Sequence, residues 1–230
     1  MTTTLAVITA PRPGQKGPGI ADYLRAAIRN GRFAPGQRLI EADLTSELDV
    51  SRGPVREAFR RLAAEGLIEL VPNRGAVVRR LSMTEALELF EVRTELEALA
   101  ARRSAGNMKD PHTRARFERE IAQIWDDRPR LSTSGYIAEN RRFHSAIMTA
   151  AGNGQLIKID ELMQLSLIMA QISSSLTSDV VAASLAEHGT IARAILDSDA
   201  DRAETAIRDH LSRAADFMKS MPENVFRHER

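Results

Sequence analysis

The sequence predicts a mainly α-helical protein with an N-terminal winged helix-turn-helix and a C-terminal all-α antiparallel helical bundle. Apolar residues recur at helical spacing through most of the 230 residues. Two short apolar segments follow the third predicted helix, as the two strands of a wing would. Short loops join the helical segments after residue 81, which indicates antiparallel neighbours in a bundle.

The composition limits the class of protein. Apolar residues make up 43% of the chain and charged residues 27%, which is typical of a globular protein. No apolar run is long enough to span a membrane. The first ten residues lack the basic start of a signal peptide. The chain contains no cysteine, which excludes disulfides and cysteine metal sites and agrees with a reducing compartment. We therefore expect a cytoplasmic protein.

The net charge of +1 conceals an asymmetry along the chain. Residues 12–80 hold 13 lysines and arginines against 8 acidic residues, whereas the rest of the chain holds 19 against 23. A basic N-terminal part favours nucleic acid as its partner, and the acidic remainder indicates a different role.

The N-terminal domain is expected over residues 18–80, after a disordered arm at 1–17 that is rich in Thr, Pro and Gly. Helical apolar spacing, capping residues and Pro/Gly turns define its elements in order. These are helices at about 18–30 and 41–48, a short extended segment at 39–40 between them, a helix at 51–65, and strands at 67–71 and 76–79 around the turn Pro72-Asn73-Arg74-Gly75. In this arrangement the third helix enters the major groove of DNA and the wing lies beside it.

The third predicted helix has two distinct faces. Ser51 is expected to cap it through its hydroxyl, and Pro54 fits the first turn. The apolar face consists of Val55, Ala58, Phe59 and Leu62, and the cationic face of Arg52, Arg56 and Arg60. The planar fork of arginine can bind a guanine edge or a phosphate with two hydrogen bonds. The alternative is a solvated basic face with no DNA contact.

This domain resembles the DNA-binding domain of the GntR family of bacterial transcription factors. The motifs that match are Gly31 with Pro35-Gly36, Ser51-Arg52 with Pro54-Val55-Arg56-Glu57-Ala58, Gly66-Leu67-Ile68, and Asn73-Arg74-Gly75. The resemblance implies that Ser51, Arg52 and Arg56 contact double-stranded operator DNA, with the wing residues Asn73, Arg74 and Gly75 beside them. Two positions depart from the family: Gly53 replaces the usual Thr, and Ala42 replaces a frequent DNA-binding Arg. The operator sequence therefore cannot be copied from relatives.

The second domain is expected over residues 81–221, followed by a tail at 222–230. Ser82 and Glu85 form a capping box that opens a long helix to about residue 105. Further helices are expected at about 111–127, 134–151, 155–176, 179–197 and 199–221. No Gly-rich phosphate loop or nucleophile elbow is present in the sequence.

Three histidines fall on the apolar faces of three of these helices. They are His144, His188 and His210. A single such histidine is usually a hydrogen-bonded core residue, but three on facing helices are hard to satisfy without a shared partner. A divalent metal bound by neutral imidazoles is one solution.

The sequences around these histidines resemble the FCD-type ligand domain of the FadR subfamily. Many members hold a metal with one Asp and three His, and the three His correspond to His144, His188 and His210. The position of the Asp is occupied by Asn140, an uncharged oxygen ligand. Zinc, nickel and manganese are all compatible with these ligands. Arg93 matches a family position and is expected to pair with an effector carboxylate, or alternatively with Glu97 one turn later.

Together these observations predict a transcriptional regulator, more often a repressor in this family, and not an enzyme. We expect a homodimer on a near-palindromic operator, controlled by a small carboxylate effector in the metal-containing domain. Two alternatives stay open. One is a metal-free regulator that binds an acyl chain or a sugar acid directly, and the other is a three-His metalloenzyme.

Overall fold

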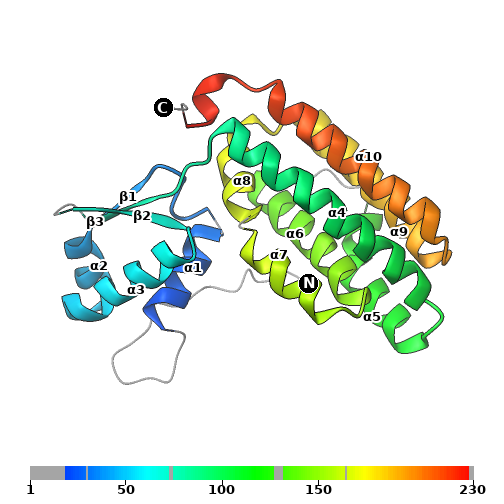
Figure 1. The fold of residues 1–230 in the computed structure, drawn as a ribbon, viewed down its shortest axis with the longest axis horizontal. Coiled ribbons are helices and arrows are strands. Elements are labelled where there is room, and N and C mark those ends of the chain that lie inside the picture. The colour runs from blue at the N-terminus through cyan, green and yellow to red at the C-terminus, as the bar shows by residue number, and fades with distance from the viewer. Residues whose placement is uncertain (1–18, 30, 73–74, 127–131, 164, 228–230) are drawn as a thin grey trace. The chain divides into compact units, whose positions relative to one another are not determined.

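The computed structural model describes residues 19–29, 31–72, 75–126, 132–163 and 165–227. The chain divides into two compact units (Figure 1). One comprises the chain up to Arg80 together with Ser166–Gln171, and the other comprises Leu81–Leu165 together with Ile172–Arg230. Among the described residues, no helix has the length and apolar character needed to cross a membrane.

The first unit is a winged helix-turn-helix, as the sequence predicts. Its elements are α1 (Ile20–Arg29), β1 (Arg38–Leu39), α2 (Glu41–Leu48), α3 (Arg52–Ala64), β2 (Ile68–Val71) and β3 (Gly75–Val78). The strands form an antiparallel sheet in the order β1-β3-β2, with Leu39 opposite Ala76 and Ile68 opposite Val78. The apolar face predicted for α3 is buried, with Val55, Phe59 and Leu62 each at most 3% exposed.

The second unit is built around the long helix α4 (Met83–Asn107). Its other helices are α5 (Pro111–Ile121), α6 (Thr133–Ala150), α7 (Gly154–Leu162), α9 (Ser178–Leu196) and α10 (Ala200–Lys219). Helix α4 packs against α10, α6, α9 and α7 (Figure 1). The predicted capping box is present, because Ser82 Oγ accepts from the Glu85 amide at 3.1 Å and Glu85 Oε2 accepts from the Ser82 amide at 2.8 Å.

Two segments differ from the sequence prediction. The single helix expected over 155–176 is divided into α7 and α8 (Leu165–Ile172), with the turn Ser173–Ser175 after them. No Pro or Gly marks this break, so helical periodicity alone joins the two pieces. The expected tail is partly structured, since Phe226 is only 3% exposed and the Arg227 amide donates to the Leu81 carbonyl at 2.9 Å. Burial of this aromatic ring holds the segment against the start of α4.

The stability of the first unit should depend on the glycine at the start of β3. Gly75 has a φ of +87°, and a Cβ there would collide with the Leu39 carbonyl oxygen. We expect Gly75→Ala to lower the free energy of unfolding by about 2 kcal/mol or more, since both the backbone conformation and the contact oppose it. Chemical denaturation followed by circular dichroism measures this. Gly53→Ala is the matched control: its Cβ meets nothing within 4 Å, so stability should hold or rise by up to about 1 kcal/mol. Equal effects of the two changes would contradict the role of Gly75.

Candidate functional site

The cationic face of α3 is exposed. The side chains of Arg52 and Arg56 are 74% and 60% exposed, and the side chain of Arg60 is 69% exposed. Arg56 Nε donates to Glu41 Oε2 at 2.8 Å, and Arg52 Nε lies 4.0 Å from the other oxygen of Glu41. A single carboxylate on α2 therefore holds two arginines of α3, while Arg60 pairs with Glu57 on its own helix.

Ser51 occupies the N-cap position of α3 but makes no cap hydrogen bond, contrary to the sequence expectation. A capping hydroxyl accepts from the second or third amide of the helix, and Pro54 at the third position has no N–H, which removes one of these two donors. The Ser51 hydroxyl is thus not committed to its helix, and the residue is exposed.

The wing is described in part. Asn73 and Arg74, which the resemblance implies beside DNA, lie outside the described residues. Gly75 begins β3, where a Cβ would meet the backbone carbonyl of Leu39. The fold therefore requires glycine at this position, because β3 passes too close to β1 there to leave room for a side chain.

The second unit brings the three predicted histidines together. His144 of α6, His188 of α9 and His210 of α10 are at most 6% exposed, and their ligand atoms all lie within 4.8 Å of one another. The ring centroids are 5.3 Å apart for His144 and His188, and 4.8 Å apart for His188 and His210. His144 Nε2 and both nitrogens of His188 are buried without a hydrogen-bond partner in the described part of the chain.

Two glutamates orient the outer rings of this cluster. Glu97 Oε2 of α4 lies 2.5 Å from His144 Nδ1, and Glu187 Oε2 of α9 lies 2.7 Å from His210 Nδ1. A proton on each Nδ1 makes these contacts hydrogen bonds to carboxylate, which leaves a lone pair on Nε2. Carboxylate–histidine pairs of this kind set the tautomer of imidazoles that bind metal ions.

Each of these glutamates is in turn held by an arginine. Arg93 Nε donates to Glu97 Oε1 at 2.5 Å, and Arg213 Nη2 donates to Glu187 Oε2 at 2.5 Å. Burial by itself raises the pKa of Glu97, but the attraction of Arg93 and His144 outweighs it and brings this pKa to about 2. Glu187 likewise has a lowered pKa, because its bonds to His210 and Arg213 outweigh its burial. Both carboxyl groups are therefore ionised at neutral pH.

Burial keeps the three imidazoles neutral. It lowers the pKa of His144, lowers that of His188 well below its usual value, and lowers that of His210 to about 4. Glu97 and Glu187 counter this effect on His144 and His210 only in part. Neutral imidazole is the form that binds a metal ion.

The two remaining predicted site residues of the second unit, Asn140 and Arg93, are both buried. Asn140 is buried on α6, one turn before His144, at 6% exposure. Arg93 is buried on α4 in the ion pair with Glu97, which is the second of the two alternatives that the sequence left open. Its Nη1 and Nη2 atoms make no hydrogen bond within the described part of the chain.

Sequence reasoning overlooked three carboxylates of these sites. Glu41 lies on α2, whereas the arginines that it contacts lie on α3. Glu187 is next to His188 in the chain, but the histidine that it contacts is His210 on another helix. Glu97 was weighed only as a partner of Arg93 and not of His144. Helical spacing does predict the Arg93–Glu97 pair, but the contacts between helices depend on tertiary packing and leave no signal in the sequence.

A winged helix with an exposed arginine face, followed by a helical unit with a buried histidine cluster, defines a class of DNA-binding regulators. Residues 17–78 match the family described as bacterial regulatory proteins, gntR family, and residues 88–213 match the FCD domain. The chain therefore belongs to the GntR family, in the subfamily that carries an FCD domain. It is a DNA-binding transcriptional regulator.

Relatives and solved structures agree with this assignment. A protein of Paenarthrobacter nicotinovorans named "Probable D-xylose utilization operon transcriptional repressor" is 31% identical over 199 residues, which is 84% of each chain. The transcriptional repressor GlaR of Escherichia coli (strain K12) is 28% identical over 207 residues, which is 82% of this chain and 89% of GlaR. The structure of E. coli McbR/YncC has the same fold, with a TM-score of 0.74 at 18% identity over 86% of this chain and 94% of that one.

The buried imidazoles predict how stability depends on pH. Their folded pKa values lie below the usual 6.5, so the unfolded chain binds more protons as the pH falls below that value. In chelator, the free energy of unfolding should fall between pH 7.5 and 5, by about 2 kcal/mol from His210, whose folded pKa is about 4, and further from His144 and His188. Urea unfolding followed through Trp125, the single tryptophan, reports on the second unit.

Two substitutions control this measurement. His210→Asn should reduce the pH dependence, because it removes one of the buried groups that titrate. His112→Asn should leave it unchanged, because His112 is exposed on α5. A free energy of unfolding that is the same at both pH values would contradict the neutral cluster.

Proposed function

We propose that this regulator is a repressor that acts in the cytoplasm as a homodimer, and that a small organic acid bound at the histidine cluster controls its affinity for an operator. One observation carries the sensor part of the proposal. Three buried imidazoles converge, and the nitrogens of His144 and His188 that face the cluster have no described partner. Buried polar atoms without partners cost free energy, so a ligand that binds them stabilises the fold.

A divalent metal ion fits the residues that are present. His144, His188 and His210 would hold it through ring nitrogens, and Glu97 and Glu187 would keep two of the rings in the required tautomer. Asn140 would supply a fourth, uncharged ligand through its side-chain oxygen. A bound ion of this type offers an open coordination position to a carboxylate.

The charges around the cluster favour an anionic effector. Arg93 compensates Glu97, Arg213 compensates Glu187, and the three imidazoles are neutral. With Asn140 in place of an acidic ligand, a divalent ion would leave the site with two uncompensated positive charges. A small carboxylate would reduce this excess, and the Nη1 and Nη2 atoms of Arg93, which Glu97 does not engage, would bind the second oxygen of that carboxylate.

In the DNA-binding unit, Arg52 and Arg56 would read base edges and the Ser51 hydroxyl would bind a phosphate. The wing residues Asn73, Arg74 and Gly75 would lie along the backbone beside them. Glu41 holds both arginines in place in the absence of DNA. Effector binding would favour one arrangement of the two DNA-binding units of the dimer, which changes operator affinity by a coupling free energy.

A metal-free regulator is the second candidate, and Asn140 is the observation that favours it. An Asn in the place of an acidic ligand weakens attraction to a cation. In this version the histidines and Arg93 would bind a sugar acid or an acyl carboxylate by direct hydrogen bonds. A three-His enzyme has less support, because the two carboxylates that contact the histidines are each engaged by an arginine.

Metal content tests the sensor site. Untagged protein purified without chelator should contain about one divalent metal ion per chain by elemental analysis, and His144→Ala should lose it because a ligand is removed. His112→Ala is the matched control and should keep its metal, since His112 is exposed outside the cluster. Absence of metal from the wild type and both variants would favour the metal-free regulator.

Base readout by α3 is tested on an operator selected from a random DNA pool. Arg52→Ala or Arg56→Ala should weaken binding to the selected site by about 1–3 kcal/mol and relax its sequence preference. Fluorescence anisotropy at one fixed salt concentration measures both, because salt alone shifts affinity. Arg116→Ala, an exposed residue of α5, controls for the lost charge. Equal weakening on every sequence would show that the two arginines bind only phosphates.

A further inference from the structure

The connection between the two units is short and is anchored on both sides. In the first unit, the Arg79 amide donates to the Leu67 carbonyl at 2.9 Å. In the second unit, the Leu81 carbonyl accepts from the Arg227 amide, also at 2.9 Å. One residue, Arg80, lies between the two anchored positions, and the units divide directly after it. The direction in which the chain leaves the second unit therefore depends on how Arg227 holds Leu81.

The anchor in the second unit comes from the segment that follows α10. Residues 222–227, here called the strap, return to the start of α4 (Figure 1). Phe226 is 3% exposed, and Arg227 pairs with Ser82 in a single parallel β-bridge. Arg227 Nη2 also donates to Glu85 Oε2 at 3.2 Å, and this is the oxygen that accepts from the Ser82 amide in the capping box. A buried ring, a backbone bond and an ion pair thus hold the strap on the first turn of α4.

Helix α10 joins the strap to the histidine cluster. It runs without interruption over Ala200–Lys219 and carries both His210 and Arg213. Glu187 of α9 contacts both of these side chains. Met221, directly before the strap, is 8% exposed, so the chain between helix and strap is packed as well. A displacement of His210 would therefore reach the strap through one helix and one short buried step.

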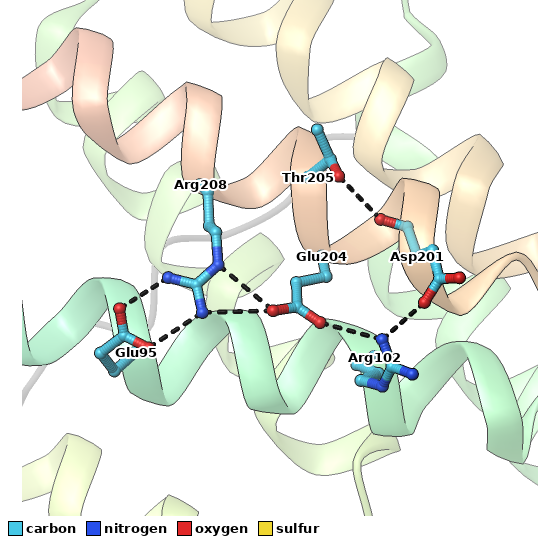
Figure 2. A network of polar contacts seen from close by, with 6 residues as sticks. All are labelled: Glu95, Arg102, Asp201, Glu204, Thr205 and Arg208. Atoms are coloured by element: carbon cyan, nitrogen blue, oxygen red, sulfur yellow. Dashed lines mark hydrogen bonds and ion pairs between the residues drawn. The ribbon is translucent and has the colours of Figure 1, made fainter.

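A polar network fixes the other half of α10 on α4 (Figure 2). Arg208 of α10 binds both carboxylate oxygens of Glu95, at 2.6 and 2.9 Å, and also contacts Glu204. Glu204 and Asp201 together hold Arg102 of α4, at 3.1 and 2.6 Å. Bidentate pairs and networks hold their geometry better than single surface ion pairs do. Since all of these residues of α10 precede its histidine, movement at the cluster is directed toward the strap.

We propose that the strap carries the state of the histidine cluster to the connection between the units. The inference rests on the proposed function, because ligand binding at the cluster is the signal. His210, when it shares a divalent ion with His144 and His188, is tied to α6 and α9, which restricts the motion of α10. The strap continues α10, so its bond to Leu81 opens less often. Coupling of this kind needs packed groups in continuous contact, which α10, Phe226 and the start of α4 provide.

Two substitutions at one position isolate the bond to Leu81. Arg227→Pro removes the amide hydrogen that the Leu81 carbonyl accepts. Phe226 already has the extended backbone that is favoured before proline, with φ −104° and ψ 162°. Arg227→Ala keeps the amide hydrogen and is the matched control. Both variants lose the exposed ion pair with Glu85, which contributes little to stability. Circular dichroism establishes that both are folded.

Hydrogen exchange followed by mass spectrometry tests the strap on the full chain, without DNA. The probe is Zn²⁺, added to protein that has been stripped with chelator. In the wild type and in Arg227→Ala, zinc should slow exchange by about tenfold in residues 203–215 of α10 and by about threefold in residues 79–86. In Arg227→Pro the slowing in α10 should persist, and the slowing in residues 79–86 should be lost. Residues 111–121 of α5 correct for any change in global stability.

The exchange pattern can contradict the strap in two ways. Slowing of residues 79–86 that survives in Arg227→Pro would show that the signal reaches the connection without the Arg227 amide. Slowing that stays within α10 in the wild type would show that no signal reaches the connection. Either result overturns the proposal.

The same preparations separate the strap from the proposed function. Zinc content is measured by elemental analysis and the operator Kd by fluorescence anisotropy. A response of the operator Kd to zinc that is the same in Arg227→Pro and in the wild type overturns the strap and keeps the proposed function. A protein that responds to zinc through Arg227 but binds no operator overturns the repressor proposal and keeps the strap. A wild type that takes up no zinc overturns the strap together with the metal site.

Discussion

Burial of three imidazoles beside one another is the constraint on which the second unit depends. Removal from water keeps His144, His188 and His210 neutral, because a charged imidazole loses its hydration there. Neutral rings still need a defined tautomer, and Glu97 and Glu187 set it for two of them. Those carboxylates are themselves buried or half-buried charges that require counterions, which Arg93 and Arg213 supply. One cluster therefore determines which polar residues four helices must carry.

The DNA-binding unit uses the same pairing of carboxylate and guanidinium at an exposed position, with a different consequence. Exposed ion pairs contribute little to stability, so the hydrogen bond of Arg56 to Glu41 and the longer ion pair of Arg52 with Glu41 matter for geometry rather than for folding. They hold the guanidinium groups on one face of α3, and they are weak enough to exchange for DNA. The buried pairs of the second unit cannot exchange in this way, because separating them would leave a charge without a partner.

The sequence predicts the elements well wherever the signal is local. The apolar spacing of α3, the capping box of Ser82 and Glu85, and the wing order all follow from neighbours within a few residues. The prediction from sequence fails where tertiary packing determines the local structure. The break between α7 and α8 has no Pro or Gly, and the burial of Phe226 depends on tertiary contacts. The missing cap bond of Ser51 is a different case, because the nearby Pro54 is a local signal that the prediction did not use. The three histidines were found by their helical faces, but Glu187 and Glu41 act across helices and leave no periodic signal.

Helix α4 links the histidine cluster to the proposed effector. It carries Arg93 and Glu97, and Glu97 orients His144. Arg93 donates to Glu97 through Nε alone, so a carboxylate bound by Nη1 and Nη2 would share the guanidinium with Glu97 without displacing it. Such an effector would be held from α4 on one side and by the cluster on α6, α9 and α10 on the other. Because coupling between two binding sites is reciprocal, operator DNA would then change effector affinity by the same factor by which the effector changes operator affinity.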